Sequence, residues 1–165
     1  MAMASSVCAA ARRRAAAMRS IYNVEVRSFT STFDLVERSL DDQRHWIVAR
    51  TGAFSALVAV DHDDDGDETV VGFTALSPYK ERAAYRTTVE DSVYVDAELQ
   101  RSGAGRALVA ELVARCEAIG ARQMIAVIGD SANTGSIGLH QALGFEVAGV
   151  LRNTGWKFGR WLDTV

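Results

Sequence analysis

Glu90 is the first residue whose position suggests chemistry, because it interrupts a β-branched and aromatic run, residues 88–95, that predicts a β-strand. Side chains alternate along a strand, so Glu90 and Asp91 face opposite sides and one carboxylate is directed inward. A half-buried carboxylate is costly unless it is paired or functional. Burial also raises its proton affinity, which suits a general base. Glu90 is therefore a candidate base; the alternative is a carboxylate at the open end of the strand or in an ion pair.

A glycine-bearing loop follows that strand and precedes a helix predicted from residue 108, with apolar residues every fourth position and Gly120 at its end. Glycines let the backbone turn tightly, and the free N–H groups at a helix start favour a phosphate. Two arginines add charge. The alternatives are a plain connection and a dinucleotide site, which lacks its third glycine at Leu108. The candidate phosphate-binding residues are Gln100, Arg101, Ser102, Gly103, Ala104, Gly105 and Arg106.

His140 lies in a second predicted helix, residues 134–143, on a face that it shares with Ile137 and Leu143. Such a histidine is either a satisfied core residue or an acid–base group, since its proton affinity is close to neutrality. Asn133 and Ser136 stand at the start of this helix. They fit an N-cap, and a cap residue can also meet a ligand.

Composition limits the class of protein. The chain has 165 residues, 48% hydrophobic and 24% charged, which is typical of one soluble globular domain. The net charge of −3 argues against a nucleic-acid surface. No apolar run is long enough to cross a membrane. Cys8 and Cys116 are too few for a disulfide framework or a zinc site, and we expect no metal.

The N-terminal segment differs from the rest. Residues 1–24 carry four arginines and no acidic residue. We therefore divide the chain into an Ala/Arg-rich segment, residues 1–20, and a catalytic domain, residues 21–165. The segment fits the first helix of the domain, predicted over residues 7–20, because Ala and Arg favour helices. It also resembles an organellar targeting peptide. We otherwise expect the protein in the cytoplasm.

The remaining pattern predicts an α/β (α+β) fold with a mixed, mostly antiparallel central sheet and helices on both faces. Ser39 and Asp42 form a capping box for a helix over residues 40–50. Further strands are predicted at residues 54–60, 69–77, 123–128 and 145–151. The acidic residues 61–68 fit a solvated hairpin tip. A calcium loop is the alternative, although its twelfth position is Gly72 rather than glutamate.

Four motifs together resemble the GNAT superfamily of N-acyltransferases, and within it the phosphinothricin N-acetyltransferases and L-amino-acid N-acyltransferases. The likeness covers about residues 21–163. The motifs are Tyr85-Arg-Thr-Thr-Val-Glu90-Asp-Ser-Val-Tyr-Val95, Gln100-Arg-x-Gly-x-Gly105, Ile137-Gly-Leu-His-Gln-Ala-Leu-Gly-Phe145 and Lys157-Phe-Gly-Arg-Trp-Leu-Asp163.

The resemblance implies direct transfer of an acetyl group from acetyl-CoA to the α-amine of a small amino acid. The glycine loop would bind the pyrophosphate, and Asn133 and Ser136 the pantetheine arm. Glu90 would be the base, and His140 would stand where most members have a tyrosine that serves the leaving thiolate. The backbone of Val93, Tyr94 and Val95 would hold the thioester oxygen. The implied acceptor-binding residues are Phe33, Lys80, Arg82, Tyr85 and Arg86, with Lys157 and Arg160 as further candidates.

The resemblance also implies a homodimer, while the charge and the lack of a long apolar run predict no nucleic-acid or membrane partner. Two departures from the family pattern predict a sheet that lacks a full first and last strand, because residues 1–14 do not match the usual first strand and the chain stops at Val165. Two alternatives remain for the function. One is acetylation of a protein N-terminus or lysine by the same fold, and the other is a non-catalytic acyl-CoA-binding module.

Overall fold

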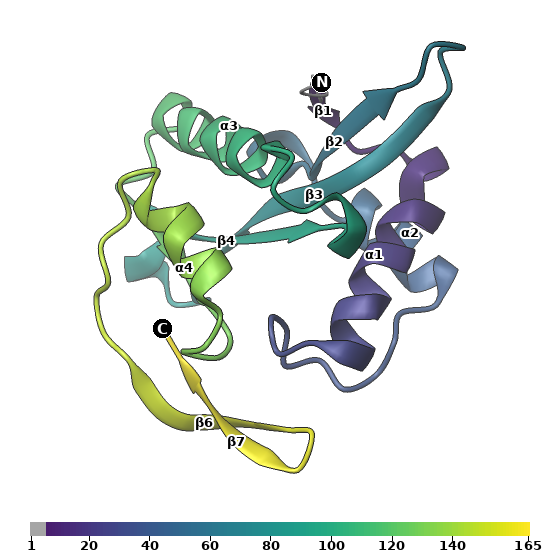
Figure 1. The fold of residues 1–165 in the computed structure, drawn as a ribbon. Coiled ribbons are helices and arrows are strands. Elements are labelled where there is room, and N and C mark those ends of the chain that lie inside the picture. Colours follow the sequence, from purple (N-terminus) through teal and green to yellow (C-terminus); the bar gives the residue numbers. More distant parts are fainter. Residues whose placement is uncertain (1–5) are drawn as a thin grey trace.

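The computed structural model describes residues 6–165. Its centre is a five-stranded sheet in the order β1-β2-β3-β4-β5 (Figure 1). The first four strands pair antiparallel, and β5 pairs parallel to β4. This confirms the predicted mixed, mostly antiparallel sheet. The strands are β1 (Ser6–Ala9), β2 (Leu57–His62), β3 (Glu68–Pro78), β4 (Thr88–Val95) and β5 (Gln123–Ala126).

Four α-helices cover the sheet, α1 (Ala15–Ser28), α2 (Leu40–Val48), α3 (Ala104–Ala118) and α4 (Thr134–Gln141). Figure 1 shows α1 and α2 on one face, with α3 and α4 on the other. The predicted capping box starts α2, since the Ser39 side chain accepts from Asp42 N and the Asp42 carboxylate accepts from Ser39 N. Short 3-10 helices occupy Arg12–Arg14, Gly52–Phe54, Ala83–Tyr85 and Ala97–Leu99.

Each face of the sheet has its own buried cluster. On the α1 side, Phe73 is fully buried and Tyr94 packs against the cluster around it. On the α3 side, Leu108 and Leu112 lie over Val89 and Leu76. Neighbouring side chains of β4 therefore enter different layers, as the alternation of a strand requires.

A two-stranded sheet, β6 (Leu151–Lys157) and β7 (Arg160–Thr164), follows α4. It joins the body of the protein through the segment after β5, because Ile128 and Val165 exchange two backbone hydrogen bonds of 2.9 and 3.0 Å. In Figure 1 this hairpin lies below β4, and its Lys157 reaches the end of α1, where it donates to the carbonyls of Glu25 and Phe29. The hairpin and β4 thus border one region of the molecule.

The N-terminal predictions need correction. Residues 7–20 do not form one helix: Ser6–Ala9 form β1, and α1 begins at Ala15 and continues to Ser28. The short strand is possible because β2 is apolar and offers a free edge to Val7 and Cys8. Arg14 ends the intervening turn and is buried in an ion pair with Glu68. Residue 20, the predicted domain boundary, falls inside α1, and residues 1–5 lie outside the described part.

Three further predictions are corrected or completed. The strand predicted at residues 145–151 is irregular up to residue 150, and β6 starts at Leu151. The first strand, expected to be incomplete, is present with four residues, and β7 reaches Thr164. The acidic residues form the β2–β3 hairpin tip, where Asp63 Oδ1 accepts from Asp65 N and Asp67 N. Within residues 6–165 no helix is long and apolar enough to cross a bilayer.

Candidate active site

The predicted phosphate-binding loop lies at the N-terminus of α3. Gly103 is the N-cap residue with φ of 94°, and Arg101 also has a positive φ of 64°. The N-cap residue has no side chain to cap the helix, Ser102 Oγ accepts from Ala104 N at a long 3.4 Å, and a Cβ on Gly103 would meet nothing within 4 Å. The loop is therefore open rather than plugged by side chains. Its free N–H groups and the exposed Arg101 and Arg106 are available to an anion.

Gly105 brings α3 close to two other elements of the site. A Cβ at this position would lie 3.3 Å from Leu139 of α4 and 3.4 Å from Val95 of β4. The start of α3 thus meets the end of β4 and the middle of α4. If the pyrophosphate of acetyl-CoA bound to this loop, the pantetheine arm attached to it could follow the junction of these three elements. The residues present therefore fit acetyl-CoA.

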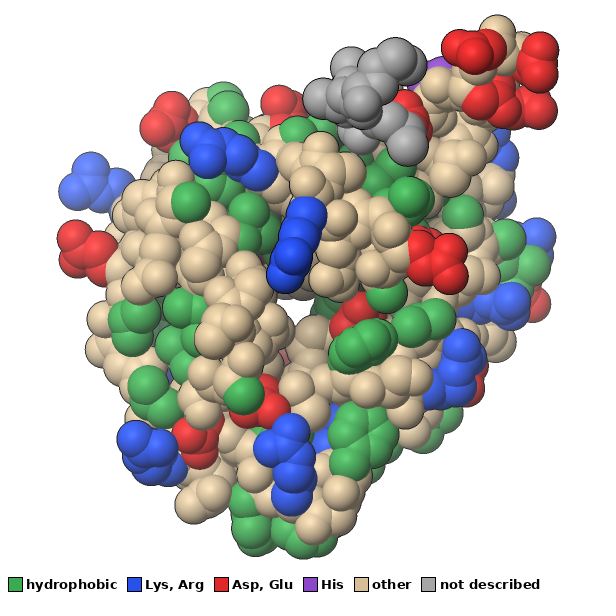
Figure 2. All heavy atoms as spheres, viewed as in Figure 1, with side chains coloured by type: hydrophobic (Ala, Val, Ile, Leu, Met, Phe, Trp, Pro, Cys, Tyr) green, Lys and Arg blue, Asp and Glu red, His purple; other side chains and the backbone are tan. Residues whose placement is uncertain are grey.

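β4 and β5 separate at the place where the family resemblance puts the thioester. The two strands pair from Thr88 to Asp91 only, against Gln123 to Ala126. The four remaining residues of β4, up to Val95, pair with β3 but have no β5 neighbour. Backbone groups on that side of Val93, Tyr94 and Val95 therefore point into the space that β5 leaves. Figure 2 shows the surface hollowed below β4.

Glu90 lies close to this split, because it forms the third of the four β4–β5 pairs, one residue before the last pair. The side chain is half-buried on the α1 side of the sheet, the face that it shares with Tyr94. Burial, and then the negative charge of Asp91, raise the pKa of Glu90. It has no ion pair among the described residues, so it is a carboxylate whose affinity for a proton exceeds that of an ordinary glutamate, which suits a general base.

Asp91, which sequence reasoning did not select, is the buried partner of His140. His140 Nε2 lies 3.1 Å from Asp91 Oδ2, and His140 Nδ1 lies 2.7 Å from the backbone oxygen of Ser136. Both side chains are almost inaccessible, at 4% and 1% exposed. Burial lowers the pKa of His140, but the hydrogen bond and charge of Asp91 outweigh it and the net effect is a raised pKa.

Asn133 has the predicted capping role. Its Oδ1 accepts from Ser136 N at 3.2 Å and starts α4. Ser136 is half-buried one turn before His140, and its backbone carbonyl is the one that His140 contacts. Both residues lie on the helix that meets Gly105, as a role along the pantetheine arm requires.

The predicted acceptor residues of the β3–β4 loop are exposed. Lys80 Nζ lies over the rings of Tyr79 and Tyr85, at 4.9 and 5.7 Å from their centroids. Arg82 and Arg86 make no ion pair within residues 6–165. This loop precedes β4 directly, so it lies at the end of the strand that is nearer to Glu90.

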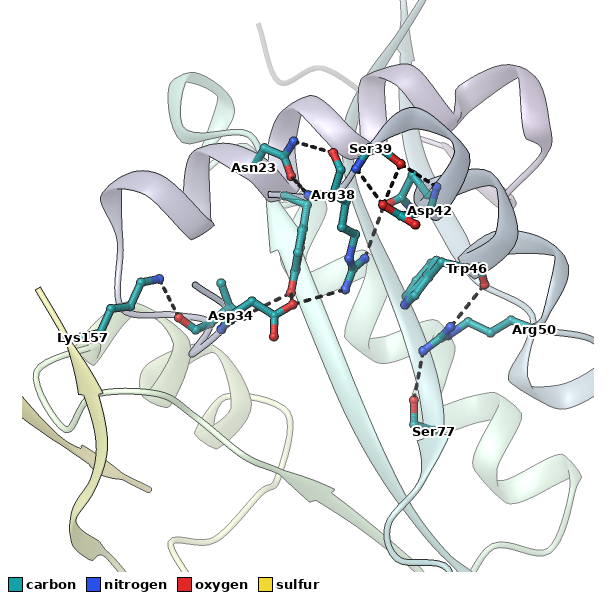
Figure 3. Close-up of polar contacts among 12 residues, drawn as sticks. Asn23, Asp34, Arg38, Ser39, Asp42, Trp46, Arg50, Ser77 and Lys157 are labelled. Atoms are coloured by element: carbon teal, nitrogen blue, oxygen red, sulfur yellow. Dashed lines mark hydrogen bonds and ion pairs between the residues drawn. The ribbon is translucent and has the colours of Figure 1, made fainter. Parts of the chain in front are cut away.

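Arg50 is a cation near Glu90 that the sequence did not reveal. Its guanidinium carbon lies 3.7 Å from the centroid of the Trp46 ring, and Nη2 donates to Ser77 Oγ at 3.4 Å (Figure 3). Ser77 is directly opposite Glu90 in the β3–β4 ladder. The half-buried Arg50 has no ion pair among the described residues and its Nε has no hydrogen-bond partner.

The segment between α1 and α2 closes the site on another side. Phe33 is wedged between two glycines: a Cβ on Gly155 would lie 2.3 Å from its ring, and one on Gly129 would lie 3.0 Å away. Phe33 therefore sits where the β6–β7 hairpin meets the segment after β5. It is half-buried, which is compatible with its predicted contact to the acceptor.

Lys157 and Arg160, proposed from sequence as acceptor-binding cations, are engaged elsewhere. The Lys157 ammonium is buried and donates to the carbonyls of Glu25, Phe29 and Thr32, at 3.3, 2.7 and 2.7 Å. Figure 3 shows it at the edge of the polar network around Asp34. Arg160 Nη2 donates to Asp130 at 2.8 Å. Both cations hold the hairpin in place. The Lys157 ammonium is buried, so each of its donors needs an acceptor, whereas the Arg160 side chain is exposed.

A groove of about 480 Å³ lies outside this region. It is lined by Val26, Arg27, Leu35, Val36, Glu37, Lys157 and Phe158. None of the proposed catalytic or acetyl-CoA-binding residues borders it. The candidate site is instead an open crevice between β4, α4 and the start of α3.

A split sheet beside an open helix N-terminus and a half-buried carboxylate defines a class of acyl-CoA-dependent transferases. The family model of the acetyltransferase (GNAT) family matches residues 18–145. The chain belongs to the GNAT family and is an acetyltransferase.

Named relatives indicate which acetyltransferases this chain is similar to. The chain is 41% identical over 149 residues to phosphinothricin N-acetyltransferase of Alcaligenes faecalis, covering 90% of this chain and 74% of the relative. It is 36% identical to an L-amino acid N-acyltransferase of Escherichia coli, covering 90% and 83% of the two chains. A solved phosphinothricin acetyltransferase of Sinorhizobium meliloti, in complex with acetyl-CoA, superimposes with a TM-score of 0.89, at 39% identity over 98% of this chain and 85% of that chain.

Proposed function

We propose that this acetyltransferase transfers the acetyl group of acetyl-CoA directly to the α-amine of a small amino acid or analogue, of the phosphinothricin, methionine sulfone or methionine sulfoximine type. The observation that carries the proposal is the half-buried Glu90 beside the split between β4 and β5, with no ion pair to any residue from 6 to 165. The relatives of known activity support the substrate class.

The roles of the residues follow from their positions. Acetyl-CoA supplies an activated acetyl thioester. The N–H groups from Gly103 to Arg106 bind its pyrophosphate, and Asn133 and Ser136 lie along its arm. The free backbone groups of β4 stabilise the oxyanion that forms on the thioester carbonyl. Glu90, directly or through water, takes a proton from the acceptor ammonium, because only the free amine is nucleophilic.

The acceptor needs a partner for its carboxylate or phosphinate. Arg50 donates to Ser77, the residue opposite Glu90 in the β3–β4 ladder, and its planar fork suits such anions. We propose that Arg50 shares this role with Lys80, Arg82, Tyr85 and Arg86 of the exposed loop. Phe33 contacts the side chain of the acceptor from the opposite side.

A homodimer is proposed from the family resemblance and from one surface feature. Trp156 and Trp161 pack edge to face at 5.1 Å, yet they are 53% and 59% exposed on the hairpin. Large exposed aromatics gathered on one element are typical of an interface. Light scattering during gel filtration will give the mass in solution.

Release of coenzyme A thiol tests the proposed activity. Purified protein is mixed with acetyl-CoA and phosphinothricin, methionine sulfone or methionine sulfoximine, and thiol is read with a chromogenic disulfide. We expect saturable release with at least one of these acceptors. Release with a peptide N-terminus or lysine peptide only would favour a protein acetyltransferase. Binding of acetyl-CoA with no release for any amine would favour a non-catalytic module.

A further inference from the structure

The two ring nitrogens of His140 both face acceptors. The backbone oxygen of Ser136, 2.7 Å from Nδ1, can only accept, so Nδ1 carries a hydrogen. Asp91 Oδ2 lies 3.1 Å from Nε2, so a second proton lies in that contact. Neither nitrogen is left free for a proton transfer to a ligand. This arrangement differs from the acid–base role that the sequence indicated for His140.

The Asp91–His140 pair lies at the end of the β4–β5 pairing. Asp91 and Ala126 form the last pair between β4 and β5, and beyond them the strands separate. His140 is on α4, whose Leu139 lies next to Gly105 at the start of α3. The Asp91–His140 contact therefore joins the helix along the acetyl-CoA arm to the strand at the place where the sheet opens.

The surroundings of the pair make it sensitive to charge. Asp91 Oδ1 is buried and has no hydrogen-bond partner within residues 6–165, so His140 is the one neutralising contact of that carboxylate there. Cys116 from α3 is the titratable group behind it, and burial, then the charge of Asp91, raise the pKa of its thiol. Phe145 packs edge to face on the ring, and Glu90 lies on the other face of β4.

We propose that Asp91 is a positioning residue: its buried ion pair with His140 fastens α4 to β4 where the sheet splits and so shapes the acetyl-CoA crevice. The proposal rests on the proposed function for its kinetic consequence only. The protonation state of His140 is a property of the folded chain and is measured without substrate.

The direction of the pH dependence follows from the raised pKa of His140. The ion pair contributes its full stability below the pKa of an unfolded histidine, about 6.5. That contribution disappears as the pH rises through the higher folded pKa. The acetyl-CoA KM should therefore rise at alkaline pH, when the imidazole loses its second proton and α4 is held less firmly.

The test begins with the imidazole nitrogen resonances of ¹⁵N-labelled protein between pH 5 and 10, taken for wild type and Asp91→Asn. We expect His140 to keep two bound protons above about pH 6.5, the ordinary pKa of a histidine. Asp91→Asn should lower the His140 midpoint by more than one pH unit. It should also raise the acetyl-CoA KM about tenfold with kcat within about threefold. Asp64→Asn at the exposed hairpin tip is the matched control and should change neither quantity.

Two results would overturn the proposal. One is a His140 midpoint near 6.5 that Asp91→Asn does not move. The other is a large loss of kcat with unchanged KM in Asp91→Asn, which would return His140 to the chemical step. If Asp91→Asn fails to fold, His140→Gln answers the same question: its loss of thermal stability relative to wild type should shrink as pH rises through the His140 midpoint. If no acceptor is acetylated, the proposed function fails. The imidazole resonances still show whether Asp91 and His140 form an ion pair.

Discussion

At the scale of single residues, the neighbours Glu90 and Asp91 have opposite environments. Glu90 is half-buried on the α1 face without an ion-pair partner in the part of the chain that the structure describes, and Asp91 is buried on the α3 face against His140. One carboxylate can therefore exchange a proton with a ligand while the other holds a helix. The difference arises from strand alternation, since both residues have the same chemistry in isolation.

Replacing Glu90 with glutamine tests its role as the base. Glu90→Gln keeps the size and removes the proton acceptor, so kcat should fall about 10²- to 10⁴-fold. The acetyl-CoA KM should hardly change, since Glu90 lies on the other face from α4. Steady-state thiol release at neutral pH measures both. Full activity of the variant would remove Glu90 from the mechanism.

The pH dependence of wild-type kcat/KM also tests the assignment of Glu90 as the general base. The raised pKa of Glu90 means that the carboxylate becomes an effective base at a higher pH than an ordinary glutamate, for which the value is about 4.3. The acid limb of kcat/KM should accordingly lie above that value and rise with pH. The Glu90→Gln variant should lose this limb, and a limb that survives unchanged would belong to another group.

At the scale of elements, the start of α3 depends on the left-handed conformation of Gly103. A side chain there meets nothing within 4 Å, so the requirement is one of backbone angle rather than space. Glycine adopts this conformation at no steric cost, and other residues do not. The turn keeps the N-terminal N–H groups of the helix exposed toward the crevice.

Gly103→Ala has a matched control in Gly66→Ala at the hairpin tip. The two glycines have φ of 94° and 86°, and both have open space around them. Each substitution should lower the free energy of unfolding by about 1–2 kcal/mol, measured in urea. Gly103→Ala alone should also raise the acetyl-CoA KM. Equal KM values for the two variants would separate the α3 terminus from acetyl-CoA binding.

At the scale of the whole molecule, charged groups help to hold the β6–β7 hairpin against the body of the protein, beside the buried Leu162. Lys157 donates to three carbonyls at the end of α1, and Arg160 binds Asp130. Asp130 also accepts from Thr30 at 3.1 Å. One hairpin thus connects α1, the segment before α2 and the segment after β5, and together these border the acceptor side.

Lys157→Met should destabilise the protein by roughly 1–3 kcal/mol, because it leaves buried carbonyls without a donor. The acceptor KM should rise more than the acetyl-CoA KM, since the hairpin and Phe33 lie on the acceptor side. Urea unfolding and initial rates give the two quantities. Lys80→Met serves as the stability control, because Lys80 is the other lysine of the chain and is exposed. A destabilisation equal to that control would show that the three contacts contribute little.

The sequence by itself determined the parts that depend on local pattern. The strand Thr88–Val95, the capping box of α2 and the glycine turn before α3 were predicted where the structure has them. Each arises from the conformational preference of a few consecutive residues, so no distant partner is needed. The motifs also indicated the family, because they lie within the residues that the family model matches.

Only the tertiary structure decided which partner each polar residue meets. Lys157 and Arg160 were candidates for the acceptor site, yet the folded chain places both on groups more than 25 positions away. Asp91 and His140 are 49 positions apart and no local pattern pairs them. β1 likewise forms only because β2 offers an edge. Burial and long-range pairing depend on the packing of the whole chain, which spacing along the sequence does not contain.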